Sequence, residues 1–96
     1  MSIVELVEFE WDDDHIEHLV HHGITPDEVE ELFDRRVVRR RGDTDAPNCF
    51  RVLGRTTVGR YLTIVYEQRA PRLLRPFTGW DMGLREREIY DRQVKS

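Results

Sequence analysis

The spacing of the apolar residues changes near Val37, and this change constrains the fold more than any other feature of the sequence. Between residues 12 and 34, apolar residues recur at intervals of three and four, which is typical of amphipathic helices. From Val37 to Phe77 they alternate or form short runs between turn residues, which is typical of strands. Separate runs of helices and strands, rather than strict alternation, predict an α+β fold.

The N-terminal part of the chain is predicted to form one strand and a first helix. Apolar and acidic residues alternate along Ile3–Trp11, which indicates a half-buried strand. Asp12–Asp14 supply N-cap side chains, whose oxygens accept hydrogen bonds from the first turn of a helix. This helix is expected to end at Gly23, because glycine readily adopts the left-handed conformation that terminates helices.

A second helix over residues 26–34 has the strongest local start signal. Thr25 is the expected N-cap, Pro26 occupies the first helical position, and Glu28 completes a capping box.

The segment that follows is predicted to form an antiparallel meander of three or four strands. The predicted strands are Arg36–Arg41, Phe50–Arg55, Tyr61–Tyr66 and Arg72–Phe77. The predicted connections are a loop over Gly42–Asn48, turns over Thr56–Gly59 and Gln68–Pro71, and a loop at Thr78–Trp80 before a final helix over about Met82–Gln93.

Length and composition limit the class of protein. Ninety-six residues suffice for one domain with a modest core, so residues 1–96 are expected to form a single domain. No apolar stretch approaches the roughly 20 residues of a membrane span, and the start of the chain lacks the features of a signal peptide. We therefore expect a cytoplasmic protein without a membrane partner. The single cysteine, Cys49, excludes an internal disulfide and a cysteine-based zinc cage.

Acidic and basic residues are segregated along the chain. Residues 1–34 hold twelve of the nineteen acidic residues and no lysine or arginine, so the remainder holds seven acidic residues and all fifteen basic ones. Fourteen of those fifteen are arginines, whose planar guanidinium groups bind phosphate or carboxylate through two hydrogen bonds. The pattern predicts a nucleic acid or an acidic protein as partner, unless the two parts neutralise each other across the fold.

Four histidines lie in the first predicted helix. They are His15, His18, His21 and His22. Imidazoles four residues apart can share a metal ion, but no HExxH motif or cysteine supports such a site, so we expect surface histidines and no metal. His22 falls at the helix C-terminus, where a positive imidazole is favoured. It is interpreted either as a helix cap or as a general acid or base.

Arginines recur along the predicted sheet. The run Arg35–Arg41 either contacts phosphate or protects an exposed sheet edge. Arg51 and Arg55 share one face of their strand because their spacing is even. If the strands pair, several guanidinium groups converge on one surface. The candidate nucleic-acid ligands are Arg39, Arg55, Arg60 and Trp80, the last as a ring that stacks on a base or instead fills the core.

Convergent arginines suit RNA cleavage by attack of a 2′-hydroxyl on the adjacent phosphate. Guanidinium groups hold the phosphate and stabilise its developing charge, while a His, Glu or Tyr side chain moves the protons. Glu86 and Tyr90 are neighbours on the last predicted helix and are candidates for such roles. The structural alternatives are a helix cap for Glu86 and a core position for Tyr90.

Several short segments of the chain recur, in the same order and spacing, in one known family. They are Phe9–Asp12 (FEWD), His22–Ile24, Phe33–Asp34, Arg51–Gly54, Gly59–Leu62, Arg75–Thr78 and Glu86–Tyr90. Through these segments, which are spread along nearly the whole chain, it resembles the BrnT family of bacterial type II toxins, which are RelE-like ribonucleases. The resemblance implies a RelE-like fold, RNA cleavage without a metal or other cofactor, and growth inhibition.

The resemblance also implies a partner and a set of site residues. The partner is a cognate DNA-binding antitoxin that covers the basic surface of the toxin, and the oligomeric state, a homo-oligomer included, stays open. The implied site residues are Arg51 and Arg75 for phosphate binding, His22 or Glu86 for proton transfer, and Thr78 and Tyr90 in support.

The chain departs from the family pattern at Thr78, Gly79 and Trp80, where the family has serine, alanine and arginine. An arginine expected near the phosphate is therefore missing, and its absence bears on catalysis more than on the fold. The alternative function is a non-catalytic module of the same fold, which binds an acidic protein or a nucleic acid through the arginines of its sheet.

Overall fold

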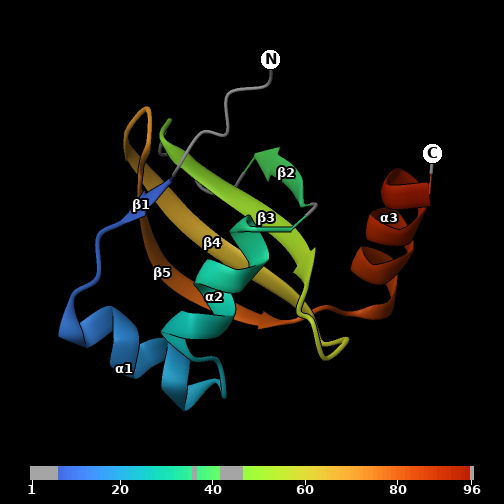
Figure 1. Ribbon diagram of the computed structural model, residues 1–96, viewed down its shortest axis with the longest axis horizontal. Coiled ribbons are helices and arrows are strands. Elements are labelled where there is room, and N and C mark those ends of the chain that lie inside the picture. The colour runs from blue at the N-terminus through green and yellow to red at the C-terminus, as the bar shows by residue number, and fades with distance from the viewer. Residues whose placement is uncertain (1–6, 36, 42–46, 96) are drawn as a thin grey trace.

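The computed structural model describes residues 7–35, 37–41 and 47–95 (Figure 1). Within them the chain forms three helices and a five-stranded mixed sheet, so the predicted α+β class is confirmed. The elements are β1 (Glu8–Phe9), α1 (Asp13–His21), α2 (Pro26–Phe33), β2 (Val38–Arg41), β3 (Cys49–Arg55), β4 (Tyr61–Ala70), β5 (Leu73–Asp81) and α3 (Leu84–Lys95). None of the helices in these residues is long and apolar enough to cross a membrane.

The sheet has the order β1-β5-β4-β3-β2. Strands β2 to β5 form an antiparallel meander, which confirms that prediction with four strands. Strand β1 adds to the outer side of β5 in parallel, with Glu8 opposite Leu73 and Phe9 opposite Leu74. The first strand therefore joins the same sheet as the meander, with both N-terminal helices in the connection between them.

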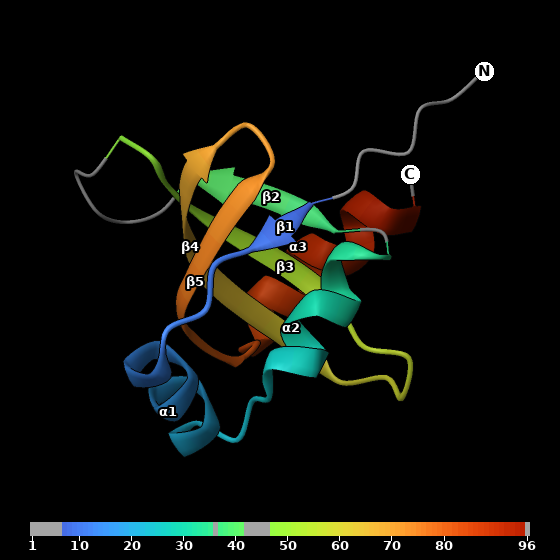
Figure 2. The same cartoon turned by 60° about the vertical axis from the view of Figure 1, so that its left-hand side comes forward.

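The two faces of the sheet carry different helices. Figure 2 shows α1 and α2 on one side of the sheet and α3 on the other; we refer to these sides as the α1/α2 face and the α3 face. The larger core lies on the α1/α2 face and consists of Leu19, Ile24, Val29, Leu32, Val52, Leu62, Ile64, Tyr66 and Leu74. Complete burial of each such aliphatic side chain contributes about 1.5–3 kcal/mol. The α3 face has a smaller cluster of Leu53, Met82 and Tyr90, so much of this face is free of helix packing.

Both N-terminal helices start where the sequence predicts. Asp12 caps α1, and its side chain accepts a hydrogen bond from the His15 backbone N–H at 2.9 Å. Thr25 and Glu28 form the predicted capping box of α2. Gly23 has a φ of +77°, which is the left-handed conformation expected after the end of a helix.

Within the described residues, the first strand ends earlier than predicted. Only Glu8–Phe9 is extended and paired, while residues 3–6 of the predicted strand lie outside the described residues. Its pairing stops there because the chain leaves β5 to reach the cap of α1 at Asp12. Residue 36 of the predicted second strand and residues 42–46 of the predicted loop also lie outside the described residues.

The hairpin of β4 and β5 is longer than predicted. The turn predicted over Gln68–Pro71 was placed too early, because β4 continues to Ala70. The loop predicted at Thr78–Trp80 is wrong, since β5 runs on to Asp81 with Trp80 opposite Thr63. A Cβ on Gly79 would lie 2.7 Å from Ile64 Cδ1, so the strand passes too close to the core for a side chain there. The final helix begins at Leu84 rather than Met82, whose side chain is buried beneath it.

Candidate functional site

A row of side chains crosses the α3 face from one strand to the next. In the register of the sheet, Arg40 lies opposite Arg51, Arg51 opposite Val65, and Val65 opposite Thr78. Neighbouring strands are about 4.8 Å apart, so the Cα atoms of Arg51 and Thr78 are separated by roughly 10 Å. Arg40 and Arg51 therefore lie on one side of Val65, and the Thr78 hydroxyl lies on the other.

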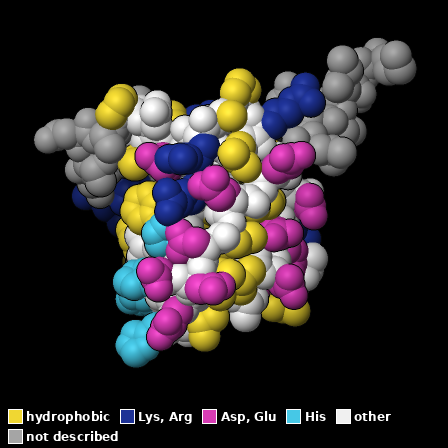
Figure 3. All heavy atoms as spheres, turned by 90° about the vertical axis from the view of Figure 1, so that its left-hand side faces the viewer, with side chains coloured by type: hydrophobic (Ala, Val, Ile, Leu, Met, Phe, Trp, Pro, Cys, Tyr) yellow, Lys and Arg dark blue, Asp and Glu magenta, His cyan; other side chains and the backbone are white. Residues whose placement is uncertain are grey.

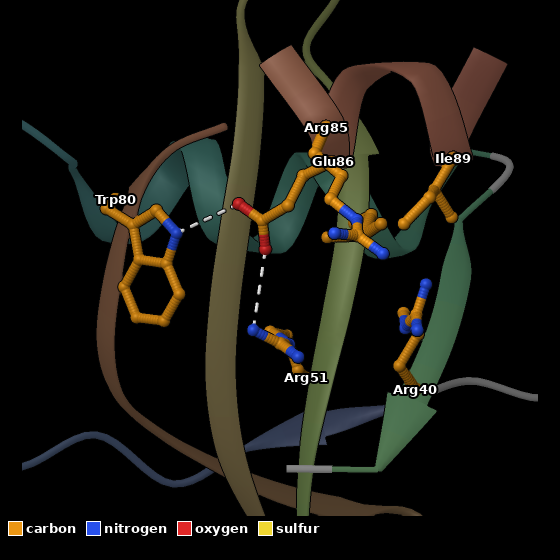
Figure 4. A pocket seen from close by; sticks show the side chains of 7 residues that line it. Arg40, Arg51, Trp80, Arg85, Glu86 and Ile89 are labelled. Atoms are coloured by element: carbon orange, nitrogen blue, oxygen red, sulfur yellow. Dashed lines mark hydrogen bonds and ion pairs between the residues drawn. The ribbon is translucent and has the colours of Figure 1, made fainter. Parts of the chain in front are cut away.

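Glu86 connects α3 to Thr63 and Trp80, which lie opposite each other on β4 and β5. Its carboxylate accepts a hydrogen bond from the Trp80 indole N–H at 3.1 Å and pairs with Arg51 Nη1 at 3.5 Å (Figure 4). It also accepts a hydrogen bond from the buried Thr63 hydroxyl at 3.1 Å. These donors come from three different strands. Glu86 therefore holds α3 against the sheet and orients both Arg51 and Trp80, rather than serving the helix cap that the sequence suggested as an alternative.

A pocket of about 460 Å³ opens beside this carboxylate. Its lining residues are Arg40, Arg51, Leu53, Trp80, Arg85, Glu86 and Ile89. Three guanidinium groups against one carboxylate leave a positive site, and guanidinium binds phosphate through charge-assisted hydrogen bonds. Trp80 retains 37% of its surface exposed, so its ring remains available for stacking. The pocket has the chemistry to hold an anion next to a planar ring.

Arg75 lies on the same face but in a different charge environment. It is opposite Glu67, donates to Asp12 at 2.8 Å, and pairs with Glu10 at 3.5 Å. The hydrogen bond to Asp12 is the main cause of a raised pKa for Arg75, and the same bond lowers the pKa of Asp12. Acidic groups that precede α1 thus neutralise Arg75, which the structure does not bring into the Arg51 pocket.

The histidine that contacts Thr78 is His18 and not His22, and neither His18 nor Thr78 lines the Arg51 pocket. His18 Nε2 lies 3.0 Å from the hydroxyl oxygen of Thr78. The His22 ring is exposed at the C-cap of α1, with its centroid 4.8 Å from that of His18. His22 therefore occupies the helix-cap position that the sequence suggested as an alternative, and α1 contacts Thr78 through His18. The sequence carried a signal for this residue, since His18 lies on the same helix flank as His22.

Tyr90 and Arg39 lie outside the pocket. Tyr90 is 6% exposed and packs edge-to-face on Tyr61 at 5.8 Å, so it occupies the core position that was its structural alternative. Arg39 points to the α1/α2 face, where its guanidinium lies 3.8 Å from the centre of the Phe50 ring and donates to Gln68. The sheet itself therefore separates Arg39 from Arg51.

Arg60 and Arg55 also have other neighbours. Arg60 donates to Glu28 at 3.1 Å, to Asp81 at 2.9 Å and to the Gly23 carbonyl at 2.7 Å, which connects α2 to the end of β5. The hydrogen bond to Asp81 is the main cause of its raised pKa. Arg55 lies over the Tyr61 ring at 4.9 Å. Of the four predicted nucleic-acid ligands, the structure brings only Trp80 into the pocket, and it adds Arg40 and Arg85.

Comparison with known proteins adds no further constraint on this site. No protein-family model matches the chain, and no curated protein matches it. Within the part of the chain that the structure describes, no group of three or more His, Cys, Asp and Glu side chains is arranged to hold a metal ion. The geometry of the pocket and the motifs of the sequence therefore carry the functional proposal.

Proposed function

We propose that this chain is the toxin of a bacterial type II toxin–antitoxin pair and cleaves RNA at the pocket beneath α3. The observation that carries the proposal is the convergence of Arg40, Arg51 and Arg85 around a pocket with the exposed ring of Trp80 in its wall. A positive site beside a stacking surface suits a single-stranded nucleotide, whose phosphate and base need these two kinds of contact.

Each residue of the pocket has a distinct role in this proposal. Arg51 binds the scissile phosphate and stabilises the charge that develops on it in the transition state. Glu86 acts as a positioning residue, because three donors already occupy its carboxylate and one of them is Arg51. Trp80 stacks on a base, and Arg40 and Arg85 attract the phosphates on either side.

The order of the elements supports the same proposal. A strand, two helices, a four-stranded antiparallel meander and a final helix on the opposite face are compatible with the RelE-like topology that the BrnT resemblance implies. In this proposal the toxin acts in the cytoplasm without a metal, and a DNA-binding antitoxin covers the arginines of the α3 face.

Induction in a bacterial host tests the proposal. We expect the unaltered chain to stop growth and to leave cleaved RNA, and Arg51→Ala to restore growth and intact RNA. Arg72→Ala is the matched control, since Arg72 is an exposed arginine in the turn between β4 and β5. Normal growth and unchanged RNA with the unaltered chain would contradict the toxin assignment.

A non-catalytic binding module is the second candidate. It is favoured by Trp80 in place of the family's arginine and by the neutralisation of Arg75 by Asp12 and Glu10. This module would bind RNA or an acidic protein through the same pocket, with affinity that falls as salt rises. Binding of RNA without new 5′ ends, measured with purified protein in a cell-free translation reaction, would favour this candidate over the toxin.

A further inference from the structure

We propose that His18 is the proton-transfer residue of the site and acts through the hydroxyl of Thr78. This inference rests on the proposed RNA cleavage and assigns to it a residue from the acidic part of the chain. Its basis is the position of the His18–Thr78 pair at the end of the row that starts with Arg40 and Arg51.

The geometry places His18 in contact with Thr78, which lies on the same face of the sheet as Arg51 with one strand, β4, between them. Thr78 and Arg51 are on the same face, with Val65 between them, so their side chains stand on either side of one position of β4. His18 Nε2 is 3.0 Å from Thr78 Oγ1, which is hydrogen-bonding distance. Leu19, the next residue of α1, is fully buried and anchors this part of the helix in the core.

The charges around His18 suit proton transfer better than phosphate binding. His18 shares a surface hollow with Asp14, Glu17 and His21, and its ring is next to that of His22. Figure 3 shows the histidines gathered at one margin of this side of the molecule, beside acidic side chains. The carboxylates repel a phosphate, so the arginines on β2, β3 and α3 bind the RNA backbone while α1 supplies the imidazole.

The reaction transfers two protons as the bond forms. Thr78 Oγ accepts the proton of the RNA 2′-hydroxyl and gives its own proton to His18 Nε2. Thr78 thus remains a neutral hydroxyl, and His18 becomes an imidazolium. The 2′-oxygen bonds to phosphorus, the bond from phosphorus to the 5′-oxygen breaks, and that oxygen takes a proton from water. The hydroxide so formed removes the proton from the His18 imidazolium. The products are a 2′,3′-cyclic phosphate and a 5′-hydroxyl end.

Substitutions at both members of the pair test the inference. The assay is cleavage of one mRNA in a cell-free bacterial translation reaction, with rate measured against the concentration of the full-length protein. His18→Gln keeps a polar group beside Thr78 but removes the imidazole, and Thr78→Val removes the hydroxyl while preserving the size of the side chain. His21→Gln is the matched control on the same helix, and Thr78→Ser is the conservative variant. Thermal melts check that each variant is folded.

We expect His18→Gln and Thr78→Val to lower the rate at saturating protein by about 10²–10⁴-fold, the usual contribution of general acid–base catalysis. The half-saturating concentration should not change, because neither side chain binds the phosphate. Added imidazole should restore part of the rate of His18→Ala. Thr78→Ser, which keeps the hydroxyl, should recover much of the rate that Thr78→Val loses, and the control His21→Gln should cleave normally.

Three outcomes overturn the inference. If the unaltered chain cleaves RNA and His18→Gln cleaves at the same rate, His18 has no such role. If His22→Gln loses the rate while His18→Gln retains it, the imidazole at the helix end is the proton carrier. If the unaltered chain cleaves no RNA, both the proposed function and this inference fail. The first two outcomes contradict the inference alone.

Discussion

Arg51 and Arg75 lie on the same face of the same sheet, yet their surroundings differ. Arg75 contacts two carboxylates that precede α1, Asp12 at 2.8 Å and Glu10 at 3.5 Å, with Glu67 opposite it on β4. Arg51 pairs with Glu86 on α3 and lines a pocket together with two more arginines, Arg40 and Arg85. Two arginines that look equivalent in the sequence therefore differ: Arg75 is held by acidic residues that precede α1, whereas Arg51 lines the pocket that we propose binds phosphate.

The comparison also shows how the segregated charges meet. The acidic N-terminal part of the chain pairs with arginines at both ends of β4. Glu28 pairs with Arg60 before the strand, and Glu10 pairs with Arg69 at its far end. Glu10 and Asp12 also pair with Arg75 on β5. The acid that contacts Arg51 comes instead from α3, within the basic part of the chain. The two parts of the chain thus neutralise each other locally, and the pocket beneath α3 keeps its excess of arginine.

The largest expected effect is the difference in RNA cleavage between Arg51→Ala and Arg75→Ala. Arg51→Ala should lower RNA cleavage by about 10²–10³-fold, as expected when one group that stabilises the transition state is lost. Arg75→Ala should leave most of the activity. The rate of appearance of new 5′ ends in one mRNA measures both. Equal losses for the two variants would mean that Arg75 also contacts the scissile phosphate.

The second prediction concerns the carboxylate that positions Arg51. Glu86→Ala should lower the free energy of unfolding by about 1–3 kcal/mol, because the buried Thr63 hydroxyl and the Trp80 indole lose their acceptor. Urea denaturation followed by tryptophan fluorescence measures this change. Glu88→Ala, an exposed position on the same helix, should stay within about 0.5 kcal/mol of the unaltered chain. Similar losses for both would show that Glu86 does not hold α3 in place.

The third prediction concerns the pH dependence of the ion pair between Arg75 and Asp12. Arg75 lowers the pKa of Asp12 below its ordinary value of 3.8, so the stabilisation is present above that value and is lost as pH falls through the lower, folded pKa. Asp12→Asn keeps a good N-cap but removes the charge. Its melting temperature should lie below that of the unaltered chain near pH 7, and the difference should disappear in strong acid. Asp13→Asn, on the first turn of α1, is the control; a difference that persists in acid would exclude the ion pair as its cause.

The smallest expected effect is on the salt dependence of RNA binding. Each phosphate contact to a single strand contributes about 0.7 to the slope of log affinity against log salt. Arg51→Ala should reduce the slope by about that amount, whereas Arg75→Ala should leave it unchanged because carboxylates already neutralise Arg75. Fluorescence anisotropy with a labelled single-stranded RNA at several salt concentrations measures the slopes. An equal reduction for both variants would indicate that RNA displaces Asp12 from Arg75.

Most of the elements could be predicted because their signals are local. The capping box at Thr25, the stop at Gly23 and the strand predicted over Phe50–Arg55 depend on neighbouring residues, and the structure confirms them. The loop predicted at Thr78–Trp80 was wrong because a glycine next to a strand usually signals a turn. Here Gly79 allows β5 to pass close to Ile64, a contact with a residue far away in the chain.

The sequence by itself determined the α+β class, an antiparallel meander of three or four strands and the concentration of arginine on its strands, since periodicity and composition are properties of the chain alone. Only the tertiary structure decided which arginines share a pocket, which are neutralised, and which histidine reaches the sheet. Those outcomes depend on strand register and on the packing of α1 and α3, and register follows from pairing between residues far apart in the sequence. A shift of one residue would move Arg51 and Thr78 to opposite faces, so their partnership could not be predicted before the strands were aligned.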